Sequence, residues 1–246
     1  MDYKRDATSF VIALDGLSRS LDANILKTRA GEKLWYHSDP DKHLLSEDAY
    51  LRLKRITDVV LGTLLLFLAL PVLAACVLAI KLESPAAAYY VQERTGKGGR
   101  RFKMYKLRTM VKNAPALKIK YQHLNVLSYP DFKIPNDPRI TKVGRVLRKT
   151  SLDELPQLIN VISGEMSLVG PRPTSFDSST YSLWHTERLE AKPGLTGLWQ
   201  ISGRCNLDFD QRARLDIAYL RNRSMWLDML ILYRTIFCVL TSDGAE

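Results

Sequence analysis

The sequence predicts a mainly helical α+β protein that is attached to a membrane. Three observations lead to this prediction. Residues 59–80 form a 22-residue run without a charge, a strongly basic segment follows it, and two short strand patterns flank a glycine-rich turn at residues 96–99. An apolar run of this length is enough for a membrane helix, and strands joined by such a turn form a hairpin.

Composition excludes several classes of protein. The chain has 246 residues, of which 46% are hydrophobic and 25% charged, so it can bury a core and is not disordered overall. Its three cysteines are scattered, which argues against a disulfide framework and for a reducing compartment. A net charge of +10 indicates an anionic partner: nucleic acid, a membrane surface or a phosphorylated substrate.

The positive charge is concentrated in one segment. Residues 81–150 contain 17 Lys and Arg but only four Asp and Glu, whereas residues 1–50 contain seven basic and nine acidic residues. Basic residues also precede the apolar run, and cytoplasmic flanks of membrane segments are rich in Lys and Arg. We therefore expect both ends of the run on the cytoplasmic face.

Pro71 lies near the middle of the apolar run, where a proline removes a helix hydrogen bond and clashes with the preceding turn. A helix broken there would have arms of about 18 and 15 Å, each half of a ~30 Å hydrocarbon core. The favoured interpretation is a re-entrant hairpin that enters and leaves on one face. A kinked transmembrane helix and a buried core helix are the alternatives.

The remaining elements follow from local signals. Ser46 is a plausible start for the helix that leads into the membrane segment, and residues 83–85 end it. Residues 111–140 contain four prolines and predict a short helix followed by a loop. Residues 226–240 predict a helix at the membrane interface or in the core, since it is apolar nearly all round. Further strands are expected at 89–93, 101–108 and 166–169, and further helices at 151–163, 181–191 and 208–222.

A carboxylate pair, Asp153-Glu154, follows Arg148 and precedes Pro156. Proline fits the first helical turn, which places the pair at a helix N-terminus, where free N–H groups attract anions. A structural role is also open: Ser151 and Glu154 have capping-box spacing, and the run by itself slightly favours a cap. The basic segment and the membrane signal favour chemistry.

Arg172 lies between Pro171 and Pro173, which restrict the backbone around it. A guanidinium held in this way is suited to bidentate phosphate binding. The alternative is a structural turn with a surface arginine.

Four runs together identify a resemblance: KRITDVVLGTLLLFLALPVL (54–73), YKLRTM (105–110), LRKTSLDELPQLINVISGEMSLVGPRP (147–173) and KPGLTGLWQISGR (192–204). In this order they resemble the bacterial sugar transferases, the monotopic phosphoglycosyl transferases, over about residues 52–240. The resemblance implies transfer of sugar-1-phosphate from a UDP-sugar to polyprenyl (undecaprenyl) phosphate, with release of UMP, as the first membrane step of exopolysaccharide assembly.

By the same resemblance, Asp153 is the nucleophile that forms a phosphosugar-aspartyl intermediate. Mg²⁺ would bind near Asp153 and Glu154, and Arg148 and Arg172 would clamp phosphate oxygens. Other candidates for substrate binding, for which structural roles are as plausible, are Lys106, Arg108, Gln200 and Arg204.

We expect three parts: a polar extension at residues 1–45, which the resemblance does not explain, a helix and membrane hairpin at 46–83, and a cytosolic catalytic domain at 84–246 with interfacial amphipathic helices. The expected location is the cytoplasmic face of the bacterial inner membrane. Expected partners are membrane lipids, downstream glycosyltransferases and another copy of the chain, but no nucleic acid.

Two other classes remain to be weighed. A basic binding module for anionic lipid or nucleic acid would fit the charge, but stacking aromatics are sparse there and the carboxylate pair would have no role. A metal-dependent phosphatase, or a glycosyltransferase without a covalent intermediate, is the other alternative.

Overall fold

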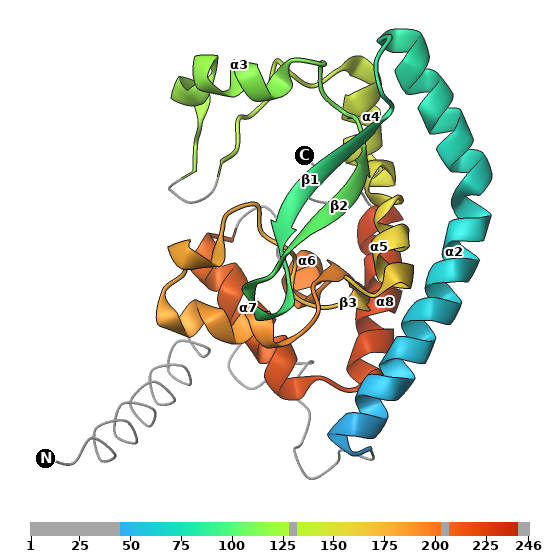
Figure 1. Cartoon of the computed structure of the whole chain (residues 1–246), viewed down its shortest axis with the longest axis vertical. Helices are drawn as coiled ribbons and strands as arrows, with labels where there is room; N and C mark the ends of the chain where they lie inside the picture. Colours follow the sequence, from blue (N-terminus) through green and yellow to red (C-terminus); the bar gives the residue numbers. More distant parts are fainter. Residues whose placement is uncertain (1–44, 128–131, 203–206, 241–246) are drawn as a thin grey trace, which may run out of the picture. The chain divides into compact units, whose positions relative to one another are not determined.

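The computed structural model describes residues 45–127, 132–202 and 207–240, in which helices surround two small sheets (Figure 1). The mainly helical α+β prediction is confirmed for these residues, whereas the expected extension at 1–45 lies almost wholly outside them. The α-helices are α2 (Glu47–Glu83), α3 (Ala114–Lys120), α4 (Lys142–Lys149), α5 (Gln157–Ser163), α6 (Leu198–Ser202), α7 (Phe209–Asn222) and α8 (Met225–Leu240). The strands are β1 (Tyr89–Thr95), β2 (Arg101–Leu107), β3 (Ser167–Val169) and β4 (Gly194–Thr196).

Helix α2 starts and ends where the sequence predicts. The Ser46 side chain accepts a hydrogen bond from the N–H of Ala49 at 3.3 Å, and the N–H of Ser84 closes the last turn on the carbonyl of Ile80 at 3.0 Å. The expected break at Pro71 is not observed, because α2 runs through this residue as one helix. Proline removes one hydrogen bond, but the adjoining turns stay helical; the ribbon bends along its length (Figure 1).

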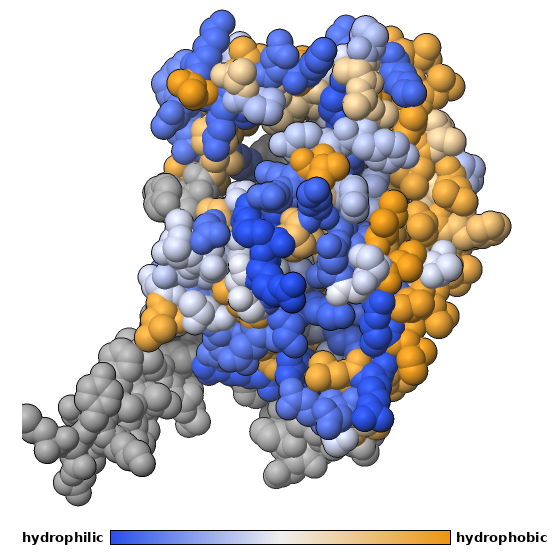
Figure 2. Space-filling model, viewed as in Figure 1, coloured by the Kyte–Doolittle hydropathy of each residue, from blue (hydrophilic) through white to orange (hydrophobic). Residues whose placement is uncertain are grey.

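The outer face of α2 is an apolar surface without cover, seen as an orange band in Figure 2. Within the described part of the chain, α2 is the one helix long and apolar enough to cross a membrane. Uncovered apolar surface of this extent marks an interaction site, in this case one suited to lipid. Its exposed large residues are Leu51, Leu53, Ile56, Val60, Leu64, Leu65, Phe67, Leu68, Leu70, Val72, Leu78 and Leu82.

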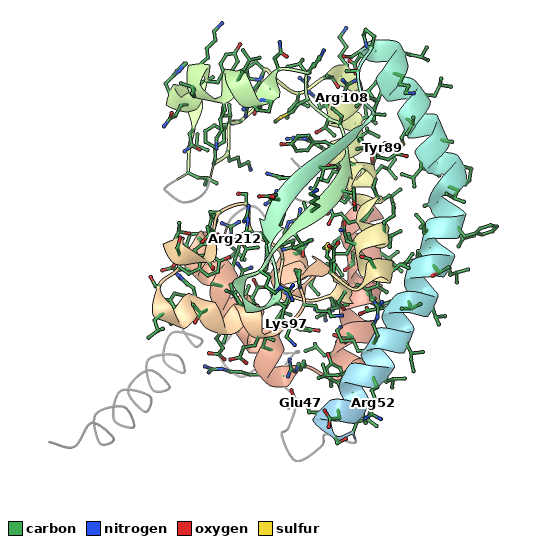
Figure 3. The ribbon with its side chains drawn as sticks, in the orientation of Figure 1. Glu47, Arg52, Tyr89, Lys97, Arg108 and Arg212 are labelled. Atoms are coloured by element: carbon green, nitrogen blue, oxygen red, sulfur yellow. The ribbon has the colours of Figure 1, made fainter. Side chains whose placement is uncertain are left out.

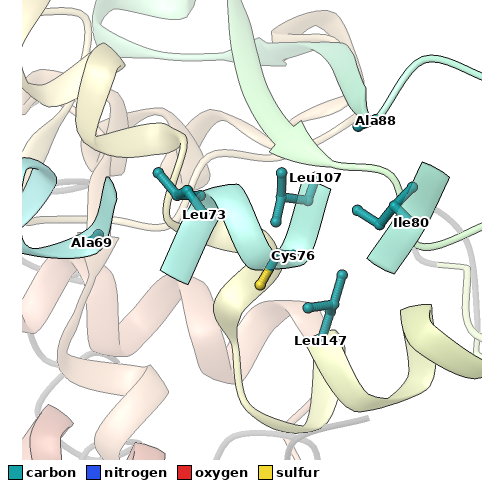
Figure 4. Packing of buried hydrophobic residues seen from close by; sticks show 7 residues of the cluster. All are labelled: Ala69, Leu73, Cys76, Ile80, Ala88, Leu107 and Leu147. Atoms are coloured by element: carbon teal, nitrogen blue, oxygen red, sulfur yellow. The ribbon is translucent and has the colours of Figure 1, made fainter. Parts of the chain in front are cut away.

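The inner face of α2 packs on the second strand of the hairpin and on α4. Figure 4 shows this core, in which Leu73, Cys76 and Ile80 of α2 surround Leu107 of β2 and Leu147 of α4. Leu152 and Leu155, which flank the carboxylate pair, pack against the same cluster. The apolar core therefore links the candidate membrane helix directly to the run that carries Asp153 and Glu154.

Polar contacts attach the first half of α2 to the same body. The Arg55 guanidinium donates to the carbonyls of Val161 and Ile162, both at 2.7 Å, at the C-terminal end of α5. The Asp58 carboxylate accepts hydrogen bonds from the Ser167 hydroxyl at 3.0 Å and the Leu168 N–H at 2.9 Å, both in β3. Buried polar groups are thus paired at this contact, as burial requires.

The predicted hairpin is confirmed. Strands β1 and β2 pair antiparallel from Tyr89 opposite Leu107 to Thr95 opposite Arg101. The turn between them needs glycine, because Gly98 and Gly99 have φ values of 64° and 76°. Strands β3 and β4 form a separate, parallel two-stranded sheet.

Two predicted helices differ in kind. Residues 151–163 form a 3₁₀ turn, Leu152–Glu154, followed by α5, which ends at Gly164 (φ 91°) as predicted. The segment expected as a helix at 181–191 is a 3₁₀ helix, Leu183–Glu190. The last helix, α8, buries Leu227 and Ile231 and exposes Trp226, Tyr233, Ile236 and Phe237, so it has both a core face and an uncovered apolar face.

Candidate active site

The carboxylate pair lies just after α4, in a short 3₁₀ turn that leads into α5. Ser151 has a positive φ of 56°, which ends α4 and turns the chain into the 3₁₀ segment that contains the pair. The backbone of α4 lies very close to the segment after β2: a Cβ added at Gly144 would be only 2.1 Å from the Thr109 carbonyl oxygen. This approach lets Arg148 Nε donate to Thr109 Oγ1 at 2.9 Å. Backbone packing therefore sets the position of Arg148 beside the pair.

Glu154 is held by two cations. Lys106 Nζ donates to its Oε1 at 2.9 Å, and Arg172 donates from Nη1 to Oε2 at 3.2 Å and from Nη2 to Oε1. Burial alone would raise the pKa of Glu154, but Arg172 and Lys106 outweigh it and keep that pKa well below the ordinary carboxyl range. The capping-box interpretation is wrong, because the Ser151 side chain makes no cap bond.

Asp153 differs from its neighbour in both partners and pKa. The residue is 8% exposed, and its carboxylate makes no hydrogen bond or ion pair with any residue that the structure describes. Burial raises the pKa of Asp153, and the charge of Glu154 adds to the increase, while Lys106 and Arg148 oppose it. The site thus contains one carboxylate neutralised by cations and one left available for a ligand or a reaction.

Arg172 is positioned by its backbone as well as its side chain. Arg188 Nη2 donates to the Arg172 carbonyl at 2.7 Å, and Arg188 is itself paired with Asp216 in the interior. Although burial alone would lower the pKa of the Arg172 guanidinium, Glu154 raises it above its usual value. The predicted proline-flanked turn therefore does more than display a surface arginine: it sets Arg172 against the carboxylate pair.

The structure brings some predicted site residues together and separates others. Asp153, Glu154, Arg148, Arg172 and Lys106 form one cluster, on the contacts and charge interactions above. This grouping joins the hairpin, the end of α4 and the proline-flanked turn. Their roles in catalysis and binding stay predictions.

The other candidates have different surroundings. Arg108 Nη2 donates to the Ser84 carbonyl at 2.8 Å, where it holds the end of α2; Figure 3 shows it near that end and Lys97 at the hairpin tip. Gln200, in α6, donates to the Leu195 carbonyl at 3.3 Å. Pro71 lies in α2, and Arg204 is outside the described residues.

Three further residues at the site are not identifiable by sequence reasoning. Arg94 is one of 17 basic residues in its segment, and nothing in its spacing distinguishes it. Its charge nevertheless interacts with Arg172 and Glu154. Arg188 and Asp216 are 28 positions apart, and their buried pairing arises only from the tertiary fold.

The fold and the site define a protein with a membrane-capable helix and a carboxylate pair set among basic side chains. Residues 49–242 match the family model described as bacterial sugar transferase, and the chain belongs to this family. The resemblance noted in the sequence is thereby confirmed.

Individual relatives are similar over most of this chain. It is 43% identical over 198 residues to the undecaprenyl-phosphate galactose phosphotransferase of Salmonella typhimurium, covering 78% of this chain and 41% of the relative. It is 42% identical to the UDP-glucose:undecaprenyl-phosphate glucose-1-phosphate transferase of Caulobacter vibrioides, covering 78% and 71%. It is 40% identical to the exopolysaccharide production protein ExoY of Rhizobium meliloti, covering 78% and 87%. The chain spans less than half the length of several of the curated relatives that it matches, the Salmonella protein among them.

Proposed function

We propose that this protein transfers sugar-1-phosphate from a UDP-sugar to undecaprenyl phosphate and releases UMP, as the first membrane step of exopolysaccharide assembly. The observation that carries the proposal is the unpaired, nearly buried carboxylate of Asp153 beside the ion-paired Glu154. The names of the Salmonella and Caulobacter relatives state the same class of reaction and the same lipid carrier.

In the first step, a carboxylate oxygen of Asp153 attacks the phosphorus that bears the sugar. The bond from that phosphorus to the UMP oxygen breaks, and UMP leaves with the electron pair. In the second step, a phosphate oxygen of the polyprenyl carrier attacks the same phosphorus. The bond to Asp153 breaks, which restores the carboxylate and gives the polyprenyl-diphosphate-sugar. A carboxylate nucleophile divides one difficult displacement into two easier ones.

The surrounding charges support both steps. Each step brings anions together, so positive groups must lie ready where the phosphate oxygens gather charge. Glu154 keeps Lys106 and Arg172 in place through its ion pairs, and Arg148 is held by Thr109. We assign Arg148 and Arg172 to the phosphate oxygens and Glu154 to the orientation of the cations.

The carboxylate pair fits Mg²⁺ in only one of its common binding modes. Among the described residues, no three acidic, His or Cys side chains form a metal cluster. Mg²⁺ often takes one or two carboxylates and completes its shell with substrate phosphates and water. Asp153 has free oxygens for this mode, while Glu154 would share its oxygens with Lys106 and Arg172. When bound, the ion would polarise the diphosphate and stabilise the departing UMP.

We also propose that α2 is a re-entrant membrane helix, with both ends at the cytoplasmic face of the inner membrane. The uncovered apolar face of α2 and the basic residues on both sides of the apolar run support this topology. Residues 84–246 would then form the cytosolic catalytic domain at the bilayer surface, and residues 1–45 a separate extension. Because α2 is continuous, the re-entrant topology requires its bend rather than a break between two helices.

The reaction can be tested without the acceptor. The purified protein, in detergent or nanodiscs with Mg²⁺, is mixed with a UDP-sugar and radiolabelled UMP. A covalent intermediate predicts exchange of label into the UDP-sugar, and intact mass spectrometry should detect the added phosphosugar. Asp153→Asn should abolish both signals while Asp210→Asn, an exposed acidic residue, retains them. Release of UDP instead of UMP, or exchange by Asp153→Asn, would contradict the mechanism.

A further inference from the structure

The candidate site holds more positive than negative side chains. Glu154 forms ion pairs with Lys106 and Arg172, and the carboxylate of Asp153 interacts electrostatically with those two cations and with Arg148. Arg94 adds a fourth positive charge that interacts with Arg172 and Glu154. Four basic side chains therefore surround two carboxylates. Excess charge in a partly desolvated site is costly unless an anion completes it.

Arg94, like Arg148, has no acidic ion-pair partner among the residues that the structure describes. Its Nη2 donates to the Gln92 side-chain oxygen at 2.7 Å, and its Nη1 makes a long contact of 3.5 Å with the Pro173 carbonyl oxygen. Both acceptors are neutral, and the buried Nε has no hydrogen-bond partner within the described part of the chain. The guanidinium is thus oriented by neutral groups while its charge is not neutralised.

A purely structural role does not account for this arginine. The hairpin is already joined to the proline-flanked segment by the hydrogen bond from Thr95 N to the Thr174 carbonyl at 3.0 Å. The Thr95 hydroxyl adds a bond to the Phe176 carbonyl at 2.7 Å. A long bond from Arg94 to the Pro173 carbonyl adds little to these contacts.

Arg94 and Arg172 also repel each other. Burial lowers the pKa of Arg94 to about 10, with the charge of Arg172 as the next cause and Glu154 in partial opposition. Arg172 is neutralised by Glu154, but Arg94 is placed against the same turn without a counter-charge of its own. A dianionic group beside them would relieve the repulsion and occupy the unused N–H donors.

We propose that Arg94 is a substrate-binding residue that, with Arg172, binds the phosphate of a substrate in this site. The inference rests on the proposed function, and two substrates carry the required chemistry: the diphosphate of the UDP-sugar and the phosphate of the polyprenyl carrier. The donor is the expected ligand, because its diphosphate must lie beside Asp153 in the first step.

Binding can be measured separately from turnover in an Asp153→Asn background. The probe is UDP-glucose, with Kd determined by isothermal titration calorimetry in nanodiscs at two salt concentrations. Arg94→Gln should weaken binding about tenfold or more, as expected for a lost charge-assisted hydrogen bond, and should reduce its salt dependence. Arg94→Lys keeps the charge and should recover part of the affinity. Arg100→Gln, an exposed charge change on the same hairpin, is the matched control and should bind as the parent does.

The second arm measures KM for undecaprenyl phosphate in the chain with Asp153 intact. A rise in this KM with Arg94→Gln, with unchanged UDP-glucose affinity, would assign Arg94 to the carrier phosphate. The inference would be overturned if Arg94→Gln, with unchanged circular dichroism and melting temperature, kept both the Kd for UDP-glucose and the KM for undecaprenyl phosphate within twofold of the parent. It would also be overturned if Arg100→Gln weakened binding as much as Arg94→Gln does. If the parent fails to bind any UDP-sugar of a panel, the proposed function itself fails, so the two failures are distinguishable.

Discussion

Arg188 donates from Nη2 to the backbone carbonyl of Arg172 at 2.7 Å, so one arginine of the interior holds the main chain of another that faces the carboxylate pair. The same Arg188 side chain pairs with Asp216 and donates to the Tyr181 hydroxyl at 3.2 Å. A planar guanidinium can serve three acceptors in fixed directions, whereas an ammonium on a flexible stem cannot match that geometry.

Arg188→Lys is therefore expected to lower kcat/KM about tenfold, about 1.4 kcal/mol of transition-state stabilisation, by loosening the Arg172 turn. Steady-state UMP release measures it. Arg221→Lys is the control, since Arg221 pairs with Glu187 on the exposed surface. Equal effects of the two substitutions would show that Arg188 has no special link to the site.

The two adjacent carboxylates should affect stability in opposite directions. Folding lowers the pKa of Glu154, so its ionised form contributes stability above the usual carboxyl range, and this contribution is lost as pH falls below it. Folding raises the pKa of Asp153, so its ionised form costs stability at neutral pH. Glu154→Gln should destabilise the fold by about 2 kcal/mol, as expected for a broken, partly exposed ion-pair cluster.

Asp153→Asn, in contrast, should raise the melting temperature at pH 7 while it abolishes turnover. Thermal unfolding in one detergent, with the two variants and the parent side by side, measures both changes. A lower melting temperature for Asp153→Asn would mean that Asp153 is a structural residue rather than an available nucleophile.

The raised pKa of Asp153 also predicts the acid limb of the activity profile. The nucleophile must be ionised, so the rate should fall as pH decreases through the pKa of Asp153, at a pH above the ordinary aspartate value of about 3.9. The measurement is single-turnover UMP release between pH 4 and 8, in which lipid-acceptor chemistry does not contribute. A rate that stays constant down to pH 4 would contradict the assignment of the nucleophile.

Gly144 should tolerate no side chain. A Cβ there would meet the Thr109 carbonyl oxygen at 2.1 Å, and both are main-chain positions that cannot move aside alone. Gly144→Ala should shift α4 together with Arg148, at a cost of about 1–3 kcal/mol in stability and a loss of activity. Gly98→Ala serves for comparison: it is strained by its φ of 64° but meets nothing within 4 Å. Its activity should stay close to that of the parent.

The topology of α2 can be tested by labelling. Arg52→Cys and Ala87→Cys place thiols at exposed positions on either side of the apolar run, in a background without the three native cysteines. With a re-entrant helix, a membrane-impermeant maleimide should label neither site in intact spheroplasts and both after lysis. Labelling of one site before lysis would establish a transmembrane helix, which the 37-residue length of α2 would also allow.

Local signals in the sequence are sufficient to predict those structural features that depend on residues adjacent in the chain. Ser46 marks a helix start through its side chain, Gly164 marks a helix end through its positive φ, and the glycine-rich turn defines the hairpin. The sequence identifies the carboxylate pair, but it does not show which basic residues lie beside the pair. Arg108, a predicted site residue, binds the end of α2, whereas Arg94, which was not predicted, lies at the site. Pro71 did not end the helix, because the tertiary contacts of both halves outweigh one lost hydrogen bond.

The contacts of Arg55 with the end of α5 and of Asp58 with β3 have a consequence for how substrates arrive. These side chains set the distance of Asp153 from the surface that receives α2, because they bind α2 directly to α5 and β3, which lie next to the carboxylate pair. With α2 in a bilayer, the reactive carboxylate would stay at one level relative to the lipid headgroups. A phosphate carried by a lipid would then reach the carboxylate by diffusion in the plane of the membrane, while the water-soluble nucleotide-sugar would approach from solution.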